Sequence, residues 1–338
     1  MVINKHIDSN FIYLISDIHS NLDLFMKSIK NLDLNKDYLF ILGDLIEKGD
    51  KNIETLDYII SLENTYKNHV FALLGNCDKV LNDFHSPSDY LLLKKYSLKL
   101  GHTILNEFLS GVGFDKYNIS SYNEALDLIN IKYKKYFDYI KYLPKGYLIN
   151  DSILLTHAEK NESIKKGLFN ELEFPNDFKL NVVGHMPSMM YKELPNLSPL
   201  FKDNILFIDG GNNVVRFGGL NLVKLNLEDL SFTYKTNHNY KLIRVKENQK
   251  RSGNTYIPQK TKVDFVIDHN SYKEIYINNQ KLYVESLNLV DNFAYDAMDI
   301  FLELNSGEYI YLVKQCDELS FVIKDNTCGL AYTKNLDI

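Results

Sequence analysis

Short apolar runs recur along the first two thirds of the chain, and each is followed by a polar residue that could take part in chemistry. The runs cover residues 11–16, 38–42, 69–74, 152–156, 181–183 and 204–208. They are continuous rather than alternating, which is typical of strands that are buried on both faces. We therefore predict a strand at each run, in the core of an α/β domain.

Segments with helical spacing lie between the strands. Residues 22–32 place Phe25 and Leu32 on one face, and residues 53–60 show the same spacing after a candidate cap at Asp50. Alternation of strand and helix puts the residues that follow the strands at the sheet edge where open α/β sheets bind ligands.

Two later regions depart from this alternation. Residues of about 80–148 are predicted to form a helical insertion. Within it, residues 121–124 have the sequence of a capping box, and apolar side chains follow along one side of the helix behind it. After Phe217, two β-type runs are placed to close a sheet.

Residues 246–262 are polar and aperiodic, so we place a domain boundary there. The prediction is a main domain over residues 1–245 and a β-rich accessory domain over residues 246–338, whose role the sequence does not indicate. Inside the accessory domain, β-type runs predict hairpins that turn at residues 278–279 and 306–307.

The composition narrows the class of protein. The 338 residues carry a net charge of −6, which argues against a general nucleic-acid binder. The three cysteines form no C-x-x-C pair and fit a reducing compartment better than a disulfide framework. No window approaches the roughly 18 apolar residues of a membrane helix, and polar residues precede the first apolar run, unlike a signal peptide. We expect a cytoplasmic protein that does not bind a membrane.

Taken in chain order, the residues after the strands form one set, namely Asp17-x-His19, Gly43-Asp44, Gly75-Asn76, His157 and Gly184-His185. The set resembles the calcineurin-like metallophosphoesterase superfamily over residues 1 to about 240. The resemblance implies an α/β fold in which two mixed sheets are sandwiched by helices. Independently of the name, two divalent ions about 3.5–4 Å apart can share one carboxylate, polarise a phosphoryl group and ionise a bridging water.

The resemblance also implies a set of metal ligands. Asp17 and His19 would bind the first ion, Asp44 would bridge both ions, and the second ion would be bound by Asn76, His157 and His185. This mixture of carboxylate, amide and imidazole suits manganese, with iron or zinc as alternatives. The other interpretation is that Asp44 and Asn76 cap helices, but helix caps do not require imidazoles at two further strand ends.

Other motifs point to one branch of the superfamily. Residues 43–49, "GDLIEKG", resemble an element of the phosphoprotein phosphatase branch, which includes bacterial diadenosine tetraphosphatases. "LGHTIL" and "YLPKGY" in the insertion, and "VVGHMP" followed by "IDGG", resemble further elements of bacterial members. Pro187 stands where the small phosphodiesterase branch has a second histidine.

Three residues depart together from the motifs of that branch. Cys77 replaces the histidine that acts as general acid, Glu47 replaces its aspartate partner, and Lys48 replaces the arginine that clamps phosphate. The lysine keeps the charge but loses the planar fork that binds two oxygens at once. Cys77 is left with three interpretations, as a passive residue of the pocket, a weak catalytic group or a metal ligand.

The proton donor and the substrate contacts stay open. The leaving group would be protonated by Cys77, Asp78 or water. His102 lies in the insertion, where family members direct groups toward the substrate. Arg216 is the first arginine of the chain and could replace the missing clamp, or it could be a solvated loop residue.

The predicted function is metal-dependent hydrolysis of phosphomonoesters, in the manner of serine/threonine or tyrosine protein phosphatases. A hydroxide that bridges two divalent ions would attack phosphorus, with Lys48 stabilising the charge that develops. The alternatives are a phosphodiesterase or dinucleoside polyphosphate hydrolase, and a non-catalytic metal-binding regulatory module. The expected partner is a phosphorylated protein or a nucleotide; the oligomeric state is not indicated.

Overall fold

The computed structural model describes residues 1–83, 102–114, 122–159, 178–258 and 260–338. The chain forms two compact units. The first unit is made of Met1–Met186, Pro199–Val214 and Leu220–Asn237. The second unit is made of Pro187–Ser198, Val215–Gly219 and His238–Ile338, so two short segments of the central chain belong to it.

The first unit contains a mixed five-stranded sheet. Its order is β11 (Phe232–Asn237), β10 (Leu220–Asn226), β2 (Phe11–Ile15), β3 (Leu39–Ile41) and β4 (Val70–Ala72). Strands β2, β3 and β4 run parallel, and β10 is antiparallel to both of its neighbours. The strands predicted at the first three apolar runs and after Phe217 are confirmed.

A mixed six-stranded sheet forms the second layer of this unit. Its order is β1 (Val2–Lys5), β5 (Gly146–Ile149), β6 (Ile153–Thr156), β7 (Leu180–Val183), β9 (Ile205–Phe207) and β8 (Leu200–Lys202). The strands predicted at residues 152–156, 181–183 and 204–208 are confirmed. The last residues of the predicted insertion form β5, because they pair with β1 and β6.

The two sheets pack face to face through alternate residues of their strands. Ile12, Leu14 and Phe40 of the five-stranded sheet share one buried cluster with Leu155 and Val182 of the other sheet. Intervening residues of β2 and β3 contribute instead to a second cluster on the opposite face. This confirms the predicted α/β fold with two mixed sheets.

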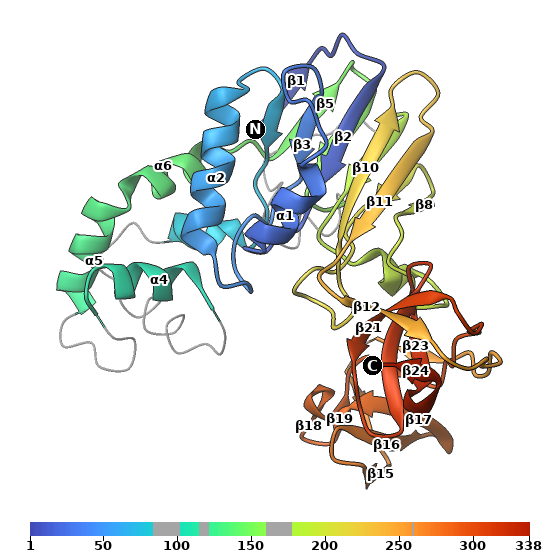
Figure 1. Cartoon of the computed structure of the whole chain (residues 1–338). Coiled ribbons are helices and arrows are strands. Elements are labelled where there is room, and N and C mark those ends of the chain that lie inside the picture. Colours follow the sequence, from blue (N-terminus) through green and yellow to red (C-terminus); the bar gives the residue numbers. More distant parts are fainter. Residues whose placement is uncertain (84–101, 115–121, 160–177, 259) are drawn as a thin grey trace. The chain divides into compact units, whose positions relative to one another are not determined.

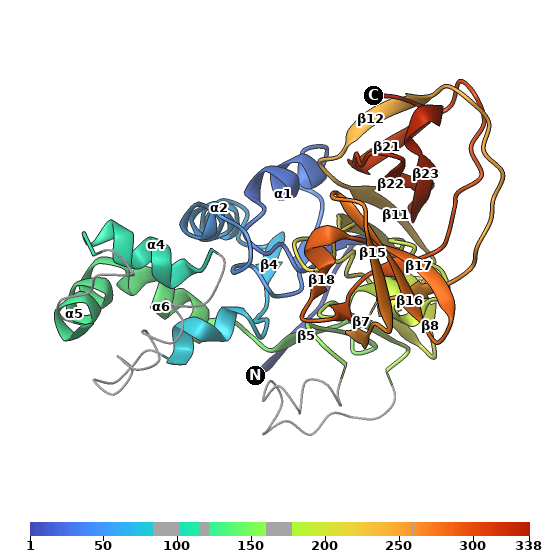
Figure 2. The same ribbon diagram turned by 90° about the horizontal axis from the view of Figure 1, so that it is seen from below.

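The second cluster joins the helices to the outer face of the five-stranded sheet. The helices are α1 (Leu22–Ile29), α2 (Asn52–Thr65), α4 (Ile104–Gly111), α5 (Tyr122–Lys132) and α6 (Lys134–Tyr142). Helices α4, α5 and α6 lie together beside α2 (Figures 1 and 2). The predicted insertion is therefore helical in its described part, and Ser121 of the predicted capping box lies outside the described residues.

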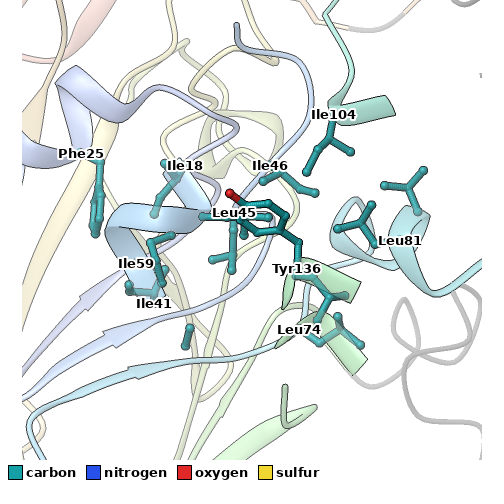
Figure 3. Packing of buried hydrophobic residues seen from close by; sticks show 14 of the residues in the cluster. Ile18, Phe25, Ile41, Leu45, Ile46, Ile59, Leu74, Leu81, Ile104 and Tyr136 are labelled. Atoms are coloured by element: carbon teal, nitrogen blue, oxygen red, sulfur yellow. The ribbon is translucent and has the colours of Figure 1, made fainter. Parts of the chain in front are cut away.

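Loop residues contribute to the same cluster. Ile18 and Ile46 follow β2 and β3, and they pack in one cluster with Ile104 of α4 and Tyr136 of α6 (Figure 3). The helical insertion is thus anchored at the end of the sheet where the predicted ligands lie.

The N-terminus of α2 differs from the prediction, because Asp50 does not cap it. The N-cap residue is Lys51, whose side chain makes no capping bond. The backbone N–H groups of Asn52 and Ile53 instead donate to the carboxylate of Glu107, at 2.9 Å each. A carboxylate from α4 supplies the charge that the positive end of α2 favours.

The second unit is rich in β-structure, as expected for the C-terminal part. One sheet has the order β23 (Thr327–Tyr332), β22 (Leu319–Lys324), β21 (Tyr309–Lys314), β12 (Lys241–Val245) and β24 (Leu336–Asp337). A second has the order β13 (Tyr256–Ile257), β20 (Ala297–Met298), β17 (Gln280–Glu285), β16 (Tyr272–Ile277) and β15 (Phe265–Asp268). A three-stranded sheet has the order β14 (Thr261–Lys262), β19 (Phe293–Ala294) and β18 (Leu289–Val290).

One predicted hairpin of this unit is confirmed and the other is wrong. Strands β16 and β17 turn at Asn278 and Asn279, whose φ angles of 51° and 64° suit a tight hairpin turn. Strand β21 pairs with β12 and β22, while Phe301 and Leu304 pair with Ser252 and Gln249. The run before residue 306 therefore finds its partner in the preceding linker rather than across the turn.

The short helices left among the described residues are of the 3₁₀ type, at η1 (Asp78–Asp83), η3 (Ser188–Tyr191), η4 (Ser286–Asn288) and η5 (Thr333–Asn335). Among the described residues, no helix combines the length and the apolar character needed to cross a membrane.

Candidate metal centre

The loops that follow β2 and β3 are joined by their backbones. Asp17 N–H donates to the carbonyl of Gly43, and His19 N–H donates to the carbonyl of Asp44, each at 3.0 Å. The parallel pairing of the two strands thus continues past their ends. It places Asp17, His19 and Asp44 beside one another without any side-chain contact being needed.

Four of the predicted ligands have left-handed backbone conformations. The φ angles are 55° at Asp17, 46° at His19, 49° at Asp44 and 69° at His185. Such angles cost a residue other than glycine about 1 kcal/mol or more, and they concentrate where function requires them. The sharp turns explain how side chains that leave successive strands reach one place.

The side chains form two groups that share Asp44. His19 Nε2 lies 3.8 Å from Asp17 Oδ1 and 3.7 Å from Asp44 Oδ2. His157 Nε2 lies 3.3 Å from Asp44 Oδ1 and 2.9 Å from Asn76 Oδ1. His185 joins the second group, since its ligand atom lies within 4.8 Å of those of Asp44 and His157.

The imidazoles are oriented by backbone carbonyls. His157 Nδ1 lies 2.8 Å from the carbonyl oxygen of Leu42, so Nδ1–H donates there and Nε2 keeps its lone pair for the centre. Burial lowers the pKa of His19 to about 4, so this ring is neutral at physiological pH. Neutral imidazole is the form that binds a metal ion.

The charges at the centre call for cations. Asp17 is fully buried, and its Oδ1 has no hydrogen-bond partner among the described residues. Burial, and then the charge of Asp44, raise the pKa of Asp17 well above its usual value. Burial opposes ionisation of Asp44 as well, but His157 and His19 hold its pKa at about 2. A buried carboxylate oxygen without a donor, beside the neutral imidazole of His19, fits a divalent ion.

Lys48 brings one positive charge to the same place. Its Nζ lies 3.2 Å from His19 Nε2, although the side chain as a whole is exposed. The carboxylates of the centre attract this ammonium group, as they would attract a metal cation.

The family of the chain follows from this arrangement together with its sequence. Residues 12–189, more than half of the chain, match the model of the calcineurin-like phosphoesterase family. The chain belongs to this family. Two layers of mixed sheet with a centre of carboxylates, an amide and imidazoles at the strand ends agree with that assignment.

Similar proteins within this family include curated bacterial enzymes. The chain is 38% identical over 76 residues to a protein named symmetrical bis(5'-nucleosyl)-tetraphosphatase from Buchnera aphidicola (strain Tuc7), a match that covers 22% of this chain and 26% of the relative. A protein of the same name from Vibrio vulnificus is 38% identical over 68 residues, with 20% and 24% covered. The chain thus spans about a quarter of the length of the curated relatives that it matches.

A solved structure, the cold-active protein-tyrosine phosphatase of a psychrophilic Shewanella, is also similar. It shares 16% sequence identity with this chain. The TM-score between the two structures is 0.43. The match covers 70% of this chain and 83% of that one.

The divergent motif after β4 holds the loops of the centre together. Cys77 N–H donates to Asp44 Oδ1 at 2.8 Å, and the half-buried Cys77 thiol has its pKa raised by burial and then by Asp44. Asp78 is fully buried and accepts backbone N–H bonds from Leu45 and Gly75, both at 2.8 Å, and from Ile46 at 3.2 Å. Its carboxylate therefore ties the loop after β3 to the loop after β4.

Burial, and then the charge of Asp44, raise the pKa of Asp78 to about 7. Both oxygens of this carboxylate accept backbone N–H groups. Its role as the acid stays a prediction.

Glu47 is turned toward the insertion. Its Oε1 accepts the backbone N–H of Ile104, the first residue of α4, at 2.9 Å. Glu47 and Glu107 thus cap α4 and α2 reciprocally. The carboxylate that stands for the acid's partner in the family motif is engaged with a helix terminus.

His102 lines a cavity that Lys48 also lines, and its contact with a substrate stays a prediction. The cavity has a volume of about 290 Å³, and Lys48, His102 and Asn213 are among its lining residues. His102 is exposed. The insertion therefore contributes to the space next to Lys48.

Arg216 belongs to the second unit, where its guanidinium pairs with the buried carboxylate of Glu285. Its backbone carbonyl accepts the hydroxyl of Tyr240 at 2.8 Å. The structure thus gives Arg216 a carboxylate partner in that unit, whereas the sequence offered it as a substrate contact.

The sequence alone missed three asparagines that support the centre. Asn212 Nδ2 donates to the carbonyl of Ile18 at 2.6 Å, and Asn213 Nδ2 donates to the carbonyl of His19 at 3.0 Å. Asn52 Oδ1 accepts Ser20 Oγ–H at 2.7 Å. Asn212 and Asn213 follow the strand-end motif "IDGG", which is visible in the sequence. The sequence does not show that they bind the backbone of a loop nearly 200 residues away.

Proposed function

We propose that this chain is a metal-dependent phosphoric ester hydrolase whose two ligand groups hold two divalent ions. The observation that carries the proposal is the position of Asp44, whose two oxygens lie 3.7 Å from His19 Nε2 and 3.3 Å from His157 Nε2. Asp17 and His19 would complete the first group, and Asn76, His157 and His185 the second. When bound, two such ions neutralise phosphoryl charge and ionise a water. Manganese is proposed first, with iron or zinc as alternatives.

The residues of the chain itself would bind and orient the substrate. Lys48 offers a point charge to a phosphoryl oxygen beside His19. His102 lines the adjoining cavity, from which it would contact the leaving group.

We expect proton donation to the leaving group to be weak. Cys77 is a poor donor, and the carboxylate of Asp78 is occupied by backbone N–H groups. Activity should therefore favour leaving groups that need little protonation, such as phosphotyrosine, aryl phosphates and nucleotide anhydrides.

Phosphomonoester hydrolysis of the protein phosphatase type is the first candidate activity, because Pro187 replaces the second histidine of the phosphodiesterase branch. Dinucleoside polyphosphate hydrolysis is the second candidate. The names of the curated relatives support it, over the quarter of their length that the chain matches.

The test compares p-nitrophenyl phosphate, bis(p-nitrophenyl) phosphate and diadenosine tetraphosphate in the presence of Mn²⁺. The variant is Asp44→Asn, and the matched control is Asp127→Asn on the exposed face of α5. Preference for the monoester supports the first candidate, and preference for the tetraphosphate supports the second. Equal turnover by Asp44→Asn and the wild type would exclude the metal mechanism. Binding of Mn²⁺ without turnover of any ester would indicate a regulatory module.

A further inference from the structure

Cys77 lies close to His19 and Asp44, two members of the first ligand group. Its Sγ, a ring nitrogen of His19 and a carboxylate oxygen of Asp44 all lie within 4.8 Å of one another. A tetrahedral zinc ion with bonds of 2.0–2.3 Å holds two ligand atoms roughly 3.3–3.8 Å apart. Side-chain shifts of roughly 1–1.5 Å would therefore bring all three atoms onto one ion.

The surroundings of the sulfur suit a ligand. The backbone N–H of Cys77 donates to Asp44 Oδ1 at 2.8 Å, which fixes this residue beside the shared carboxylate. The side-chain amide of Asn76 donates to Sγ at 3.6 Å, so the sulfur is already used as an acceptor. Hydrogen bonds to a ligand atom orient it and tune its bond to the metal.

A second observation, independent of the cysteine, points to a cation on this side of Asp44. Asp17 is fully buried, and its Oδ1 has no hydrogen-bond partner within the described part of the chain. The same oxygen lies 3.8 Å from His19 Nε2, a member of the group that contains Cys77. A buried carboxylate oxygen with no donor is costly unless a cation contacts it.

The alternative role of Cys77 is that of an acid oriented by a carboxylate partner at the position of Glu47. The structure does not place Glu47 in that role. Glu47, which stands at the partner's position in the motif, accepts the N–H of Ile104 at 2.9 Å. Asp78, the next residue in the motif, is bonded to backbone N–H groups through both of its oxygens.

We propose that the Cys77 thiolate is a ligand of the first metal ion, together with Asp17, His19 and Asp44. The inference rests on the metal centre of the proposed function. Thiolate ligands select zinc or iron over manganese, so at the first position Cys77 would favour these two alternatives to manganese. On binding, the bond between sulfur and metal forms as the S–H bond breaks, and the proton is released to solvent.

The experiment uses Co²⁺ as the probe on the full chain. The wild type should show a near-ultraviolet charge-transfer band from thiolate to cobalt, which Cys77→Ser and Cys77→Ala both lose. Cys316→Ser is the matched control, because Cys316 is a buried residue of the second unit and should leave the band unchanged. Both Cys77 variants should also lose at least about tenfold in Zn²⁺ affinity, with less than about threefold change for Mn²⁺.

Visible d–d bands of bound cobalt without the thiolate band would overturn the inference. So would Cys77→Ala with unchanged Zn²⁺ affinity and native circular dichroism. Failure of the proposed function looks different, because the wild type would then bind metal without ester hydrolysis, or bind none at all. Hydrolysis with Mn²⁺ and cobalt binding without the sulfur band would leave the proposed function standing alone.

Discussion

The carboxylate of Glu47 accepts the backbone N–H of Ile104 at 2.9 Å, so the residue next to Lys48 caps the insertion helix. The carboxylate of Glu107, on the same helix, accepts the backbone N–H groups of Asn52 and Ile53. These three bonds join the segment between β3 and the first turn of α2 to helix α4 of the insertion. The structure therefore gives Glu47 a structural partner in place of the catalytic partner that its motif suggests.

Replacing Glu47 by glutamine should affect stability more than turnover. Glu47→Gln keeps an acceptor but removes the charge at the helix terminus, which should lower the free energy of unfolding by about 0.5–1 kcal/mol. Turnover of p-nitrophenyl phosphate should change less than about threefold. Urea unfolding and steady-state kinetics measure both, with Glu228→Gln on the exposed surface as control. A hundredfold loss of turnover in a stable variant would make Glu47 part of the proton donor.

A methyl group at Gly75 should disturb the shared carboxylate directly. A Cβ added there lies 2.0 Å from Asp44 N and 2.2 Å from Asp44 Oδ1, so Asp44 must move. Gly75→Ala should therefore weaken metal binding by at least about tenfold, as measured by calorimetric titration with Mn²⁺. Gly113→Ala is the comparison, because its added Cβ meets nothing within 4 Å and carries only the cost of its φ of 88°. Unchanged metal binding in Gly75→Ala would mean that Asp44 is not a ligand.

Asp78→Asn should destabilise the protein. Asparagine offers one oxygen to three backbone N–H groups and turns an NH₂ donor toward the rest, which should cost at least about 2 kcal/mol in urea unfolding. The surface control Asp127→Asn should stay within about 0.5 kcal/mol of the wild type. An Asp78→Asn protein of normal stability that has lost turnover would identify Asp78 as the acid instead.

The metal-free protein should lose stability in acid through His19. Burial lowers the pKa of His19 to about 4, below the unfolded value of about 6.5. Between these values the unfolded chain binds a proton at this ring that the folded chain does not. Protonation of His19 therefore does not affect the free energy of unfolding above pH 6.5. As the pH drops from 6.5 to 4, it lowers this free energy by about 3 kcal/mol.

The measurement is urea unfolding of metal-free wild type and His19→Asn at pH 7 and pH 4.5. The wild type should lose more stability than the variant between the two values, because carboxylates such as Asp78 titrate in both proteins. Equal losses would show that His19 is not buried in its neutral form.

Much of the fold and of the candidate site could be predicted because both depend on local pattern. Apolar runs buried on both faces predict the strands of the two sheets, and the residue that follows each run must lie at the sheet edge. Asp17, Asp44 and Asn76 follow three such runs, so the parallel order of β2, β3 and β4 brings them together. The metal-binding role of these residues remains a prediction.

Contacts between distant segments could not be predicted in this way. Glu47 and Glu107 find their helix termini across more than 50 residues, and a single sequence has no periodicity that encodes such a pair. The local signal at Asp50 predicted a cap that Glu107 supplies instead. Likewise, nothing in the run before residue 306 shows that Gln249 and Ser252 are its partners.

The backbone bonds that join the loops after β2 and β3 have a consequence for ions of different radius. Asp17 and Asp44 are carried by chain segments that are hydrogen-bonded to each other, so the gap between these carboxylates is set by main-chain geometry. When a larger ion replaces a smaller one, other ligands of the centre must then move to make room for it. The loops of His157 and His185 are joined in the same way, since Gly184 N–H donates to the carbonyl of His157 at 2.9 Å. Asn76 follows a different strand, β4, so the coordination sphere should expand toward Asn76.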